Sequence, residues 1–242
     1  MMKTNSKLKL RAANGDEVAG GPEEKTQPPG NLQERVYQQM RSALIAGHYV
    51  PGQSFTIRSL AAQFDTSVIP VRDALNRLVA ERALEQAASS RSISVPRMSR
   101  AKFQEILKIR IALEPMITVI AVPHVTEEDI DAMNAATQDM SREFKAAQTR
   151  RFLAANQAFH FRLYRAAGTT VLMPIIESLW VQAGPYIHQV TYSAQGGEAA
   201  ESHHLEILRS LRRGDAIGAA EAVRKDLADA ADTILKNGEF VE

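Results

Sequence analysis

The feature that most constrains the fold is a change of hydrophobic period at Pro96. From Ser99 to the end, apolar residues recur at helical spacing, without the two-residue alternation of a half-buried strand. Breaks in this pattern fall near Pro123, Ala147, Gly168, Gly196 and Gly214. Pro174 and Pro185 leave open whether one helix is split in two. Residues 98–242 therefore predict an antiparallel, all-α bundle of about six helices.

Residues 31–97 have a different organisation. Two helices are expected over Leu32–Leu44 and Thr56–Phe64, and a third begins at Ser67, which can cap it. Two short strands follow, Ala83–Gln86 and Ser92–Val95, around a serine-rich turn. Three helices and a β-hairpin wing predict a winged helix-turn-helix, so the whole chain is mainly α.

The first 30 residues are rich in Gly, Pro, Lys and Glu, lack a helical period and are predicted to be a disordered tail. Neither a secretory signal nor an apolar run long enough to cross a membrane is present. The chain has no cysteine, which excludes disulfides and thiolate metal sites. A cytoplasmic location and no membrane partner are expected.

Charge is divided unevenly along the chain. Residues 31–97 contain eight arginines, no lysine and five acidic residues, whereas the region from Met98 onward has a net charge of −3. Guanidinium groups form paired hydrogen bonds with phosphate and with guanine. The basic segment therefore favours double-stranded DNA as the partner, and a solvated surface without a ligand is the alternative.

Three pieces of the N-terminal segment carry a family resemblance. They are Gly47–Gln53 (GHYVPGQ), Arg58–Ala61 (RSLA) and Pro70–Leu78 (PVRDALNRL). Their order and spacing resemble those of the GntR family of bacterial transcriptional regulators. The resemblance implies that the start of the third helix enters the major groove of an operator.

By the same resemblance, Arg58 and Arg72 occupy positions that contact DNA, and Ser67 is available to a phosphate at the helix start. An alternative for Arg72 and for Arg77 is an ion pair with Asp73 or Glu81 on an exposed helix face.

Two departures from the family affect DNA recognition. Val68 stands where many members have arginine, and Ser89-Ser90 replaces a wing-tip glycine. Val68 and Ile69 are expected to make apolar contact, for example with a thymine methyl group. Arg91 is the candidate wing contact to phosphate or the minor groove.

The C-terminal region resembles the all-helical ligand-binding (FCD) domain of the FadR-type branch, which often holds a divalent metal and a carboxylate effector. The stretch from Ile109 to Glu114 is similar to the Arg-x-x-Leu-Glu that opens this domain. Arg110 is therefore a candidate for binding a small organic acid. A salt bridge with Glu114 on the helix surface is the alternative.

Four positions match the family's metal ligands, two with altered residues. Asn156 stands where the family has aspartate, His160 and His204 match two of its histidines, and Asp226 replaces a third. Asn156 and His160 are four residues apart and so share a helix face. Two histidines and a carboxylate suit Zn, Ni, Mn or Fe. We expect Asn156, His160 and His204 also to border the effector, and a polar pocket without metal remains the alternative.

The expected protein is a homodimer, since two-fold related recognition helices read a palindrome. The apolar positions Ile106, Ile109, Leu113 and Ile117 are candidates for the contact. The predicted function is an effector-controlled transcriptional regulator, with repression the common arrangement in the family, and not an enzyme. A metal-dependent enzyme or metabolite-binding protein, and a direct metal sensor, are the alternatives.

Overall fold

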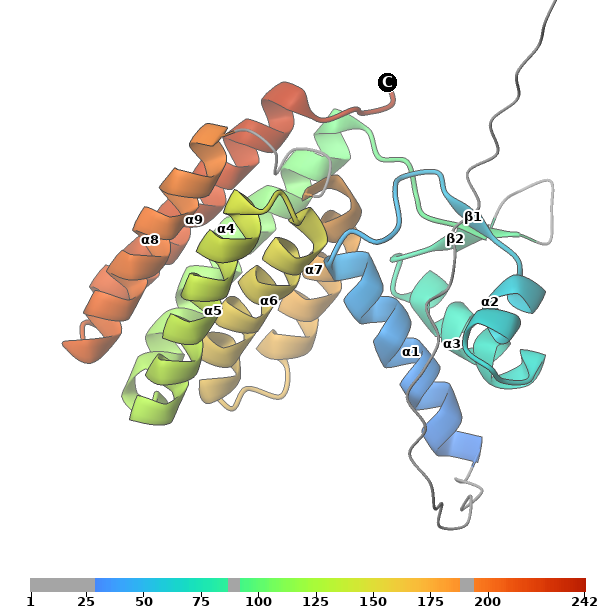
Figure 1. Cartoon of the computed structure of the whole chain (residues 1–242), viewed down its shortest axis with the longest axis horizontal. Coiled ribbons are helices and arrows are strands. Elements are labelled where there is room, and N and C mark those ends of the chain that lie inside the picture. Colours follow the sequence, from blue (N-terminus) through green and yellow to red (C-terminus); the bar gives the residue numbers. More distant parts are fainter. Residues whose placement is uncertain (1–28, 87–91, 188–193) are drawn as a thin grey trace, which may run out of the picture.

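The computed structural model describes residues 29–86, 92–187 and 194–242, with side chains from residue 32 and, after the second gap, from residue 201. The predicted tail over residues 1–30 therefore lies almost entirely outside the described residues. Figure 1 shows a bundle of helices joined by one long helix, α1, to a smaller unit of helices and strands. Both parts of the predicted architecture, the winged helix-turn-helix and the helical bundle, are present.

The smaller unit begins with α1 (Pro29–Ile45), α2 (Ile57–Gln63) and α3 (Val68–Ala80). Thr56 caps α2 through a reciprocal capping box with Ser59. Gly47 ends the α1 segment with φ +65°, a left-handed conformation that suits glycine. The three predicted helices are therefore confirmed, with boundaries that differ by a few residues.

The wing contains one strand more than expected. Strands β2 (Glu85–Gln86) and β3 (Ile93–Ser94) pair antiparallel, and β1 (Ser54–Phe55) pairs with the other edge of β3. The sheet order is β1-β3-β2. Two residues are too few to show strand alternation, so the sequence carries no signal for β1.

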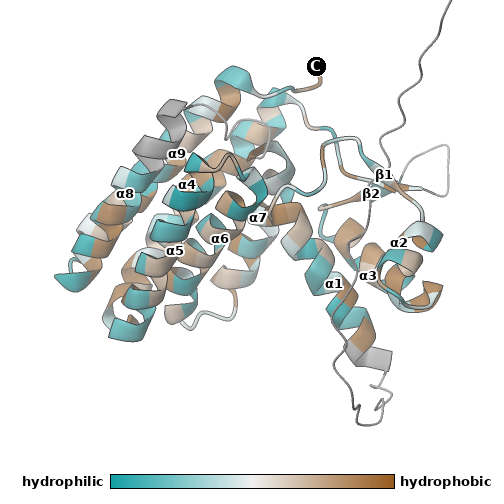
Figure 2. Ribbon diagram, in the orientation of Figure 1, coloured by the Kyte–Doolittle hydropathy of each residue, from teal (hydrophilic) through white to brown (hydrophobic). Residues whose placement is uncertain are grey.

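Six α-helices follow Pro96 in the part of the chain that the structure describes, as predicted. They are α4 (Arg100–Ala121), α5 (Glu127–Lys145), α6 (Thr149–Ala166), α7 (Leu172–Ile187), α8 (Ala194–Arg212) and α9 (Ala216–Asn237), with a short 3-10 turn, η1 (Val122–His124), after α4. Figure 2 shows polar and apolar residues on the same bundle helices, the pattern of helices with one face buried.

Two expectations about helix limits need comment. The break expected near Gly196 falls between the end of α7 at Ile187 and the start of α8 at Ala194, and Gly196 itself lies in the first turn of α8. Neither proline splits α7: Pro174 is in its first turn, where no amide hydrogen is needed, and Pro185 lies near its end. Among the described helices, none is both long and apolar enough to cross a bilayer.

The position of α1 determines how the two parts meet. This helix packs against α3 on one side and against α6 and α7 on the other, so buried side chains form a continuous core from the smaller unit into the bundle. Gly184 of α7 allows the close approach, since a Cβ atom there would lie 2.5 Å from the carbonyl oxygen of Leu44.

The predicted dimer positions do not share one exposed face. Ile106 and Ile117 are 5% and 0% exposed and belong to the core, which corrects that expectation. Ile109 is 45% exposed, and Leu113 is half-buried. The helical period of α4 identifies an amphipathic helix but does not say which of its apolar residues the neighbouring helices cover.

Candidate functional site

The first candidate site is the exposed start of α3. Ser67 is the N-cap residue, is exposed, and makes no capping hydrogen bond through its side chain. Val68 and Ile69, which follow it, are 38% and 63% exposed. We call Ser67, Val68, Ile69 and Arg72 the recognition surface.

The opposite face of α3 explains this exposure. Val71, Leu75 and Leu78 are fully buried at spacings of four and three residues, which fixes the rotation of the helix. Arg72 therefore projects outward and forms no ion pair or hydrogen bond with any residue that the structure describes. Such a guanidinium retains its donors for phosphate or a base edge.

Two other predicted contacts can be compared with this surface. Arg58 on α2 is also exposed and, within the described residues, without an ionic partner. Arg91 lies outside the described residues. Arg77, in contrast, forms ion pairs with Glu34 and Glu81, so the ion-pair alternative applies to Arg77 and is not seen for Arg72.

The second candidate site is a buried group of three potential metal ligands, which we call the histidine cluster. It consists of His160 on α6, His204 on α8 and Asp226 on α9, each at most 8% exposed. His160 Nε2 lies 3.2 Å from His204 Nε2 and 3.2 Å from Asp226 Oδ2. His204 Nε2 lies 3.7 Å from Asp226 Oδ1. Three helices that are distant in sequence thus bring together three of the four predicted ligands.

These separations suit a divalent cation. Ligand atoms about 2.0–2.1 Å from a tetrahedral zinc ion lie about 3.3 Å from one another, close to the observed distances. Asn156 lies one turn before His160, is half-buried, and makes no side-chain hydrogen bond within the described residues. Its amide oxygen is therefore available as a fourth ligand, although no described contact joins it to the cluster.

A second layer of hydrogen bonds orients His160. The hydroxyl of Tyr164 lies 2.8 Å from Glu114 Oε2 and 3.2 Å from His160 Nδ1. Since the hydroxyl donates its one proton to the carboxylate, it accepts a hydrogen bond from His160 Nδ1–H. Nε2 of His160 then presents its lone pair to the cluster. Two acceptors, this nitrogen and the Asp226 carboxylate, face each other and need a proton or a metal ion between them.

Charge and burial act together on these groups. Burial lowers the pKa of His204 to about 4, so its imidazole is neutral at pH 7 and can offer a lone pair. Burial opposes ionisation of Asp226, but the charge of His204 and a hydrogen bond from His160, in the protonated forms of these imidazoles, bring its pKa below the ordinary value. Burial, reinforced by Glu114, raises the pKa of Tyr164 well above its usual value, so this residue remains a hydroxyl donor.

The candidate effector residue Arg110 lies in the same region. It is 3% exposed, and its Nε lies 2.6 Å from Glu114 Oε1. The pair with Glu114 therefore exists, but it is buried and not on the helix surface. The guanidinium also lies 4.4 Å from the ring centroid of Trp180, whose indole nitrogen is buried without a hydrogen-bond partner in the described structure.

From the sequence, Glu114 is expected only as the alternative salt-bridge partner of Arg110, and neither Tyr164 nor Trp180 is assigned to this site. Tyr164 follows His160 by four residues and Glu114 follows Arg110 by four, so helical spacing carries a signal for both. Trp180 reaches the cluster only through tertiary packing on His160, at 5.5 Å between ring centroids.

A winged helix with an outward-facing arginine that has no ionic partner among the described residues, joined to a helical domain with a buried polar site, is the architecture of a ligand-responsive DNA-binding regulator. Residues 32–92 match the bacterial regulatory proteins of the gntR family, and residues 105–229 match the FCD domain. The chain belongs to the GntR family of transcriptional regulators, in the FadR-type branch that carries an FCD effector-binding domain.

Individual relatives agree with this assignment. The HTH-type transcriptional regulator McbR of Escherichia coli K12 is 28% identical over 201 residues, which are 80% of this chain and 90% of the relative. The HTH-type transcriptional repressor GlaR of the same organism is 23% identical, with 79% and 90% covered. The structure of E. coli McbR/YncC superposes with a TM-score of 0.79 at 25% identity and covers 85% of this chain and 97% of that one.

Proposed function

We propose that this regulator binds a palindromic operator as a homodimer and that a small organic acid, held beside a divalent metal at the histidine cluster, controls its DNA affinity. The observation that carries the proposal is the convergence of His160, His204 and Asp226 within 4.8 Å of one another in the bundle interior. A lone buried histidine is more often hydrogen-bonded than metal-bound, but three facing ligand atoms with oriented lone pairs favour a cation.

The proposal assigns metal, effector and DNA binding to different residues. His160, His204 and Asp226, with Asn156 as the fourth ligand, would hold Zn, Ni, Mn or Fe, which would supply a positive centre for a carboxylate effector. Arg110 would attract the same carboxylate, but it shares its charge with Glu114. The recognition surface and Arg58 would contact the major groove and its phosphates. Arg91 remains the candidate contact from the wing.

We assign the homodimer contact to an exposed apolar stripe on α4. Ile109, Met116 and Ile120 are 45%, 53% and 39% exposed and lie along one stripe of the helix, at spacings of seven and four residues. Covering such a stripe in a symmetric contact would place two recognition helices at a fixed separation. Repression relieved by the effector is the expected sign, in keeping with the relative named as a repressor.

The test is a thermal-shift panel of organic acids, each with and without Zn²⁺, Ni²⁺ or Mn²⁺. A ligand that binds the native state raises the unfolding midpoint. We expect a metal-dependent rise that Asp226→Asn and His204→Ala abolish. His203→Ala is the matched control, because His203 is the neighbouring histidine and pairs with Asp229 outside the cluster. No shift with any metal would refute the metal-dependent part of the proposal.

A DNA-binding measurement separates the regulator from the enzyme alternative. Fluorescence anisotropy with the DNA upstream of its own gene should show binding that weakens as salt rises. DNA affinity that ignores Arg72 would favour a helical module that docks to another partner.

A further inference from the structure

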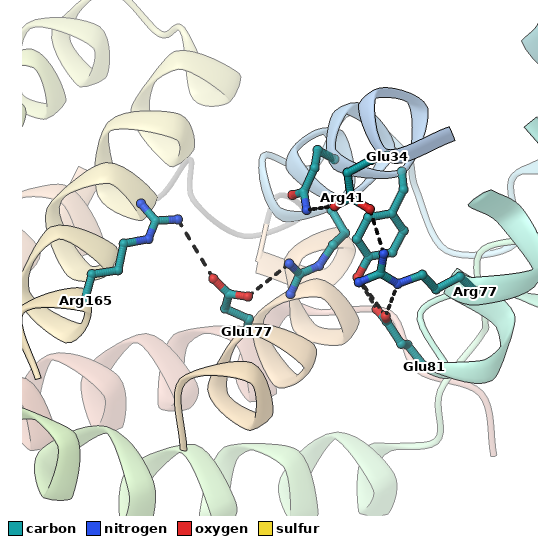
Figure 3. Close-up of polar contacts among 8 residues, drawn as sticks. Glu34, Arg41, Arg77, Glu81, Arg165 and Glu177 are labelled. Atoms are coloured by element: carbon teal, nitrogen blue, oxygen red, sulfur yellow. Dashed lines mark hydrogen bonds and ion pairs between the residues drawn. The ribbon is translucent and has the colours of Figure 1, made fainter. Parts of the chain in front are cut away.

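The carboxylate of Glu177 joins the DNA-binding part of the chain to the bundle, in addition to the continuous apolar core between them. Arg41 on α1 lies 3.0 Å, from Nη1 to Oε2, from Glu177 on α7, and Figure 3 shows this ion pair bridging the two parts. The two side chains are 12% and 20% exposed. A pair that is largely removed from water is screened weakly by salt, and loss of either partner leaves the other charge poorly solvated.

Glu177 has a second cationic neighbour on α6, the helix that carries His160 of the histidine cluster. Arg165 of α6 lies 3.9 Å from the other carboxylate oxygen, Oε1, and is 64% exposed. In Figure 3 the carboxylate lies between the two arginines. One negative charge cannot fully neutralise two guanidinium groups, so a stronger contact with either arginine weakens the contact with the other.

The contact with Arg41 is incomplete. Arg41 Nε is buried and has no hydrogen-bond partner in the described structure. An unsatisfied buried donor costs free energy, so the docked arrangement is less stable than a fully paired one. A small displacement of α7 can therefore change the balance between the two arginines.

The position of Arg41 is linked to the recognition helix. Its guanidinium lies 5.6 Å from the ring centroid of Tyr37 on α1, and Arg77 of α3 stacks on the same ring at 3.6 Å. The Tyr37 hydroxyl donates to Glu81 at the end of α3, 2.7 Å away. Figure 3 also shows the ion pair of Arg77 on α3 with Glu34 on α1, so we expect α3 to move together with α1.

Helix α7, which carries Glu177, also contacts the histidine cluster. Trp180 follows Glu177 by three residues on α7, one turn further along, and its ring contacts His160 at 5.5 Å and Arg110 at 4.4 Å. A change at the cluster that moves this indole also moves the helix turn that carries Glu177.

We propose that Glu177 is a positioning residue, shared between Arg165 and Arg41, which holds the DNA-binding part against α7 and transmits changes at the histidine cluster to the recognition surface. The docked arrangement leaves Val68 and Ile69 exposed, so the recognition surface is accessible to DNA in it, and we take it as the DNA-binding arrangement. The transmission rests on the proposed function of the cluster, whereas the docking role of Glu177 can be measured without any metal.

The docking role is tested by the distance between the two parts in the full-length protein. Because the natural chain has no cysteine, spin labels at Ala62→Cys on α2 and Ala135→Cys on α5, both exposed, report this distance by pulsed electron paramagnetic resonance. Labelled chains are diluted with unlabelled ones, so that pairs within one chain dominate. We expect one narrow distribution, which Glu177→Gln broadens and Arg41→Lys, with its charge kept, broadens less.

DNA affinity is measured on the same variants without added metal. Glu177→Gln should weaken binding at least about fivefold, the lower end of typical allosteric coupling. Arg41→Gln should also weaken binding, and the double variant should be no weaker than Glu177→Gln alone, because Glu177→Gln already removes the interaction with Arg41. Glu221→Gln, which removes a charge from a surface pair with Arg224, is the control and should change nothing.

Zn²⁺ then separates this inference from the proposed function. Glu177→Gln should bind Zn²⁺ like the wild type, but Zn²⁺ should no longer change its affinity for DNA. A wild type that does not bind Zn²⁺ would count against the metal in the proposed function, while the metal-free measurements would still decide the docking role. Unchanged distances and DNA affinity in Glu177→Gln, or additive effects in the double variant, would overturn this inference.

Discussion

The hydroxyl of Tyr164 lies 3.2 Å from Nδ1 of His160, and this contact determines which imidazole nitrogen faces the histidine cluster. The tyrosine donates its hydroxyl proton to Glu114, so it must accept a hydrogen bond from His160, whose ring proton is therefore on Nδ1. The lone pair of the imidazole is then on Nε2, where it is available to a metal ion. A buried hydroxyl thus orients a candidate metal ligand without touching the site of the ion.

Removal of this hydroxyl should weaken metal binding while the ligands remain. We expect Tyr164→Phe to lower Zn²⁺ affinity by about 10-fold to 100-fold, the usual effect of losing a partner that orients a ligand. Competition with a chelating dye measures the affinity. Tyr49→Phe is the control, because that buried hydroxyl contacts Met40 Sδ and Gln63 in the DNA-binding part of the chain and not the histidine cluster. Equal affinity of Tyr164→Phe and wild type would contradict the tautomer assigned to His160.

Arg72 should contribute directly to operator binding. We expect Arg72→Ala to cost about 1–3 kcal/mol of binding free energy if the guanidinium contacts a base. Arg72→Lys should retain most of the charge-dependent affinity but lose discrimination between operator variants, since an ammonium cannot form the paired hydrogen bonds. Anisotropy at several salt concentrations measures both quantities. A loss that is equal for all DNA sequences would instead assign Arg72 to a phosphate.

Tyr37 should make stability sensitive to alkaline pH. Burial, with the nearby Glu81, raises its pKa to about 12 from an ordinary value of 10. The unfolded chain therefore loses the tyrosine proton first, and the free energy of unfolding should fall as pH rises from 10 to about 12. Urea denaturation of wild type and Tyr37→Phe measures the difference. The advantage of wild type should be constant below pH 10 and shrink above it, and a pH-independent difference would disprove the assignment.

Gly184 should be required for contact between α1 and α7. An added Cβ atom would lie 2.5 Å from Leu44 O and 2.6 Å from Ile45 Cα, both backbone atoms that cannot move alone. We expect Gly184→Ala to destabilise the protein by about 1–3 kcal/mol, as overpacking does. An unhindered helical glycine shows the opposite sign, a gain of up to about 1 kcal/mol. Thermal unfolding distinguishes the two signs.

Much of the architecture follows from local pattern. The apolar period, the cap at Thr56 and the left-handed glycines at Gly47, Gly168 and Gly214 are properties of short segments, so the helices and most of their ends were predictable. The strand β1 was not, because it is too short to show a period.

The sequence by itself determined the family, the order of helices and the residue types that a DNA contact and a metal would need, because motifs and helical spacing are local in the chain. Only the tertiary structure decided which of these residues meet. The cluster of His160, His204 and Asp226 requires three helices to pack at one point, and the contact of Arg41 with Glu177 joins residues 136 positions apart. Such contacts depend on how distant faces are buried together, and no periodicity within one helix encodes the side chains that an opposing helix will cover.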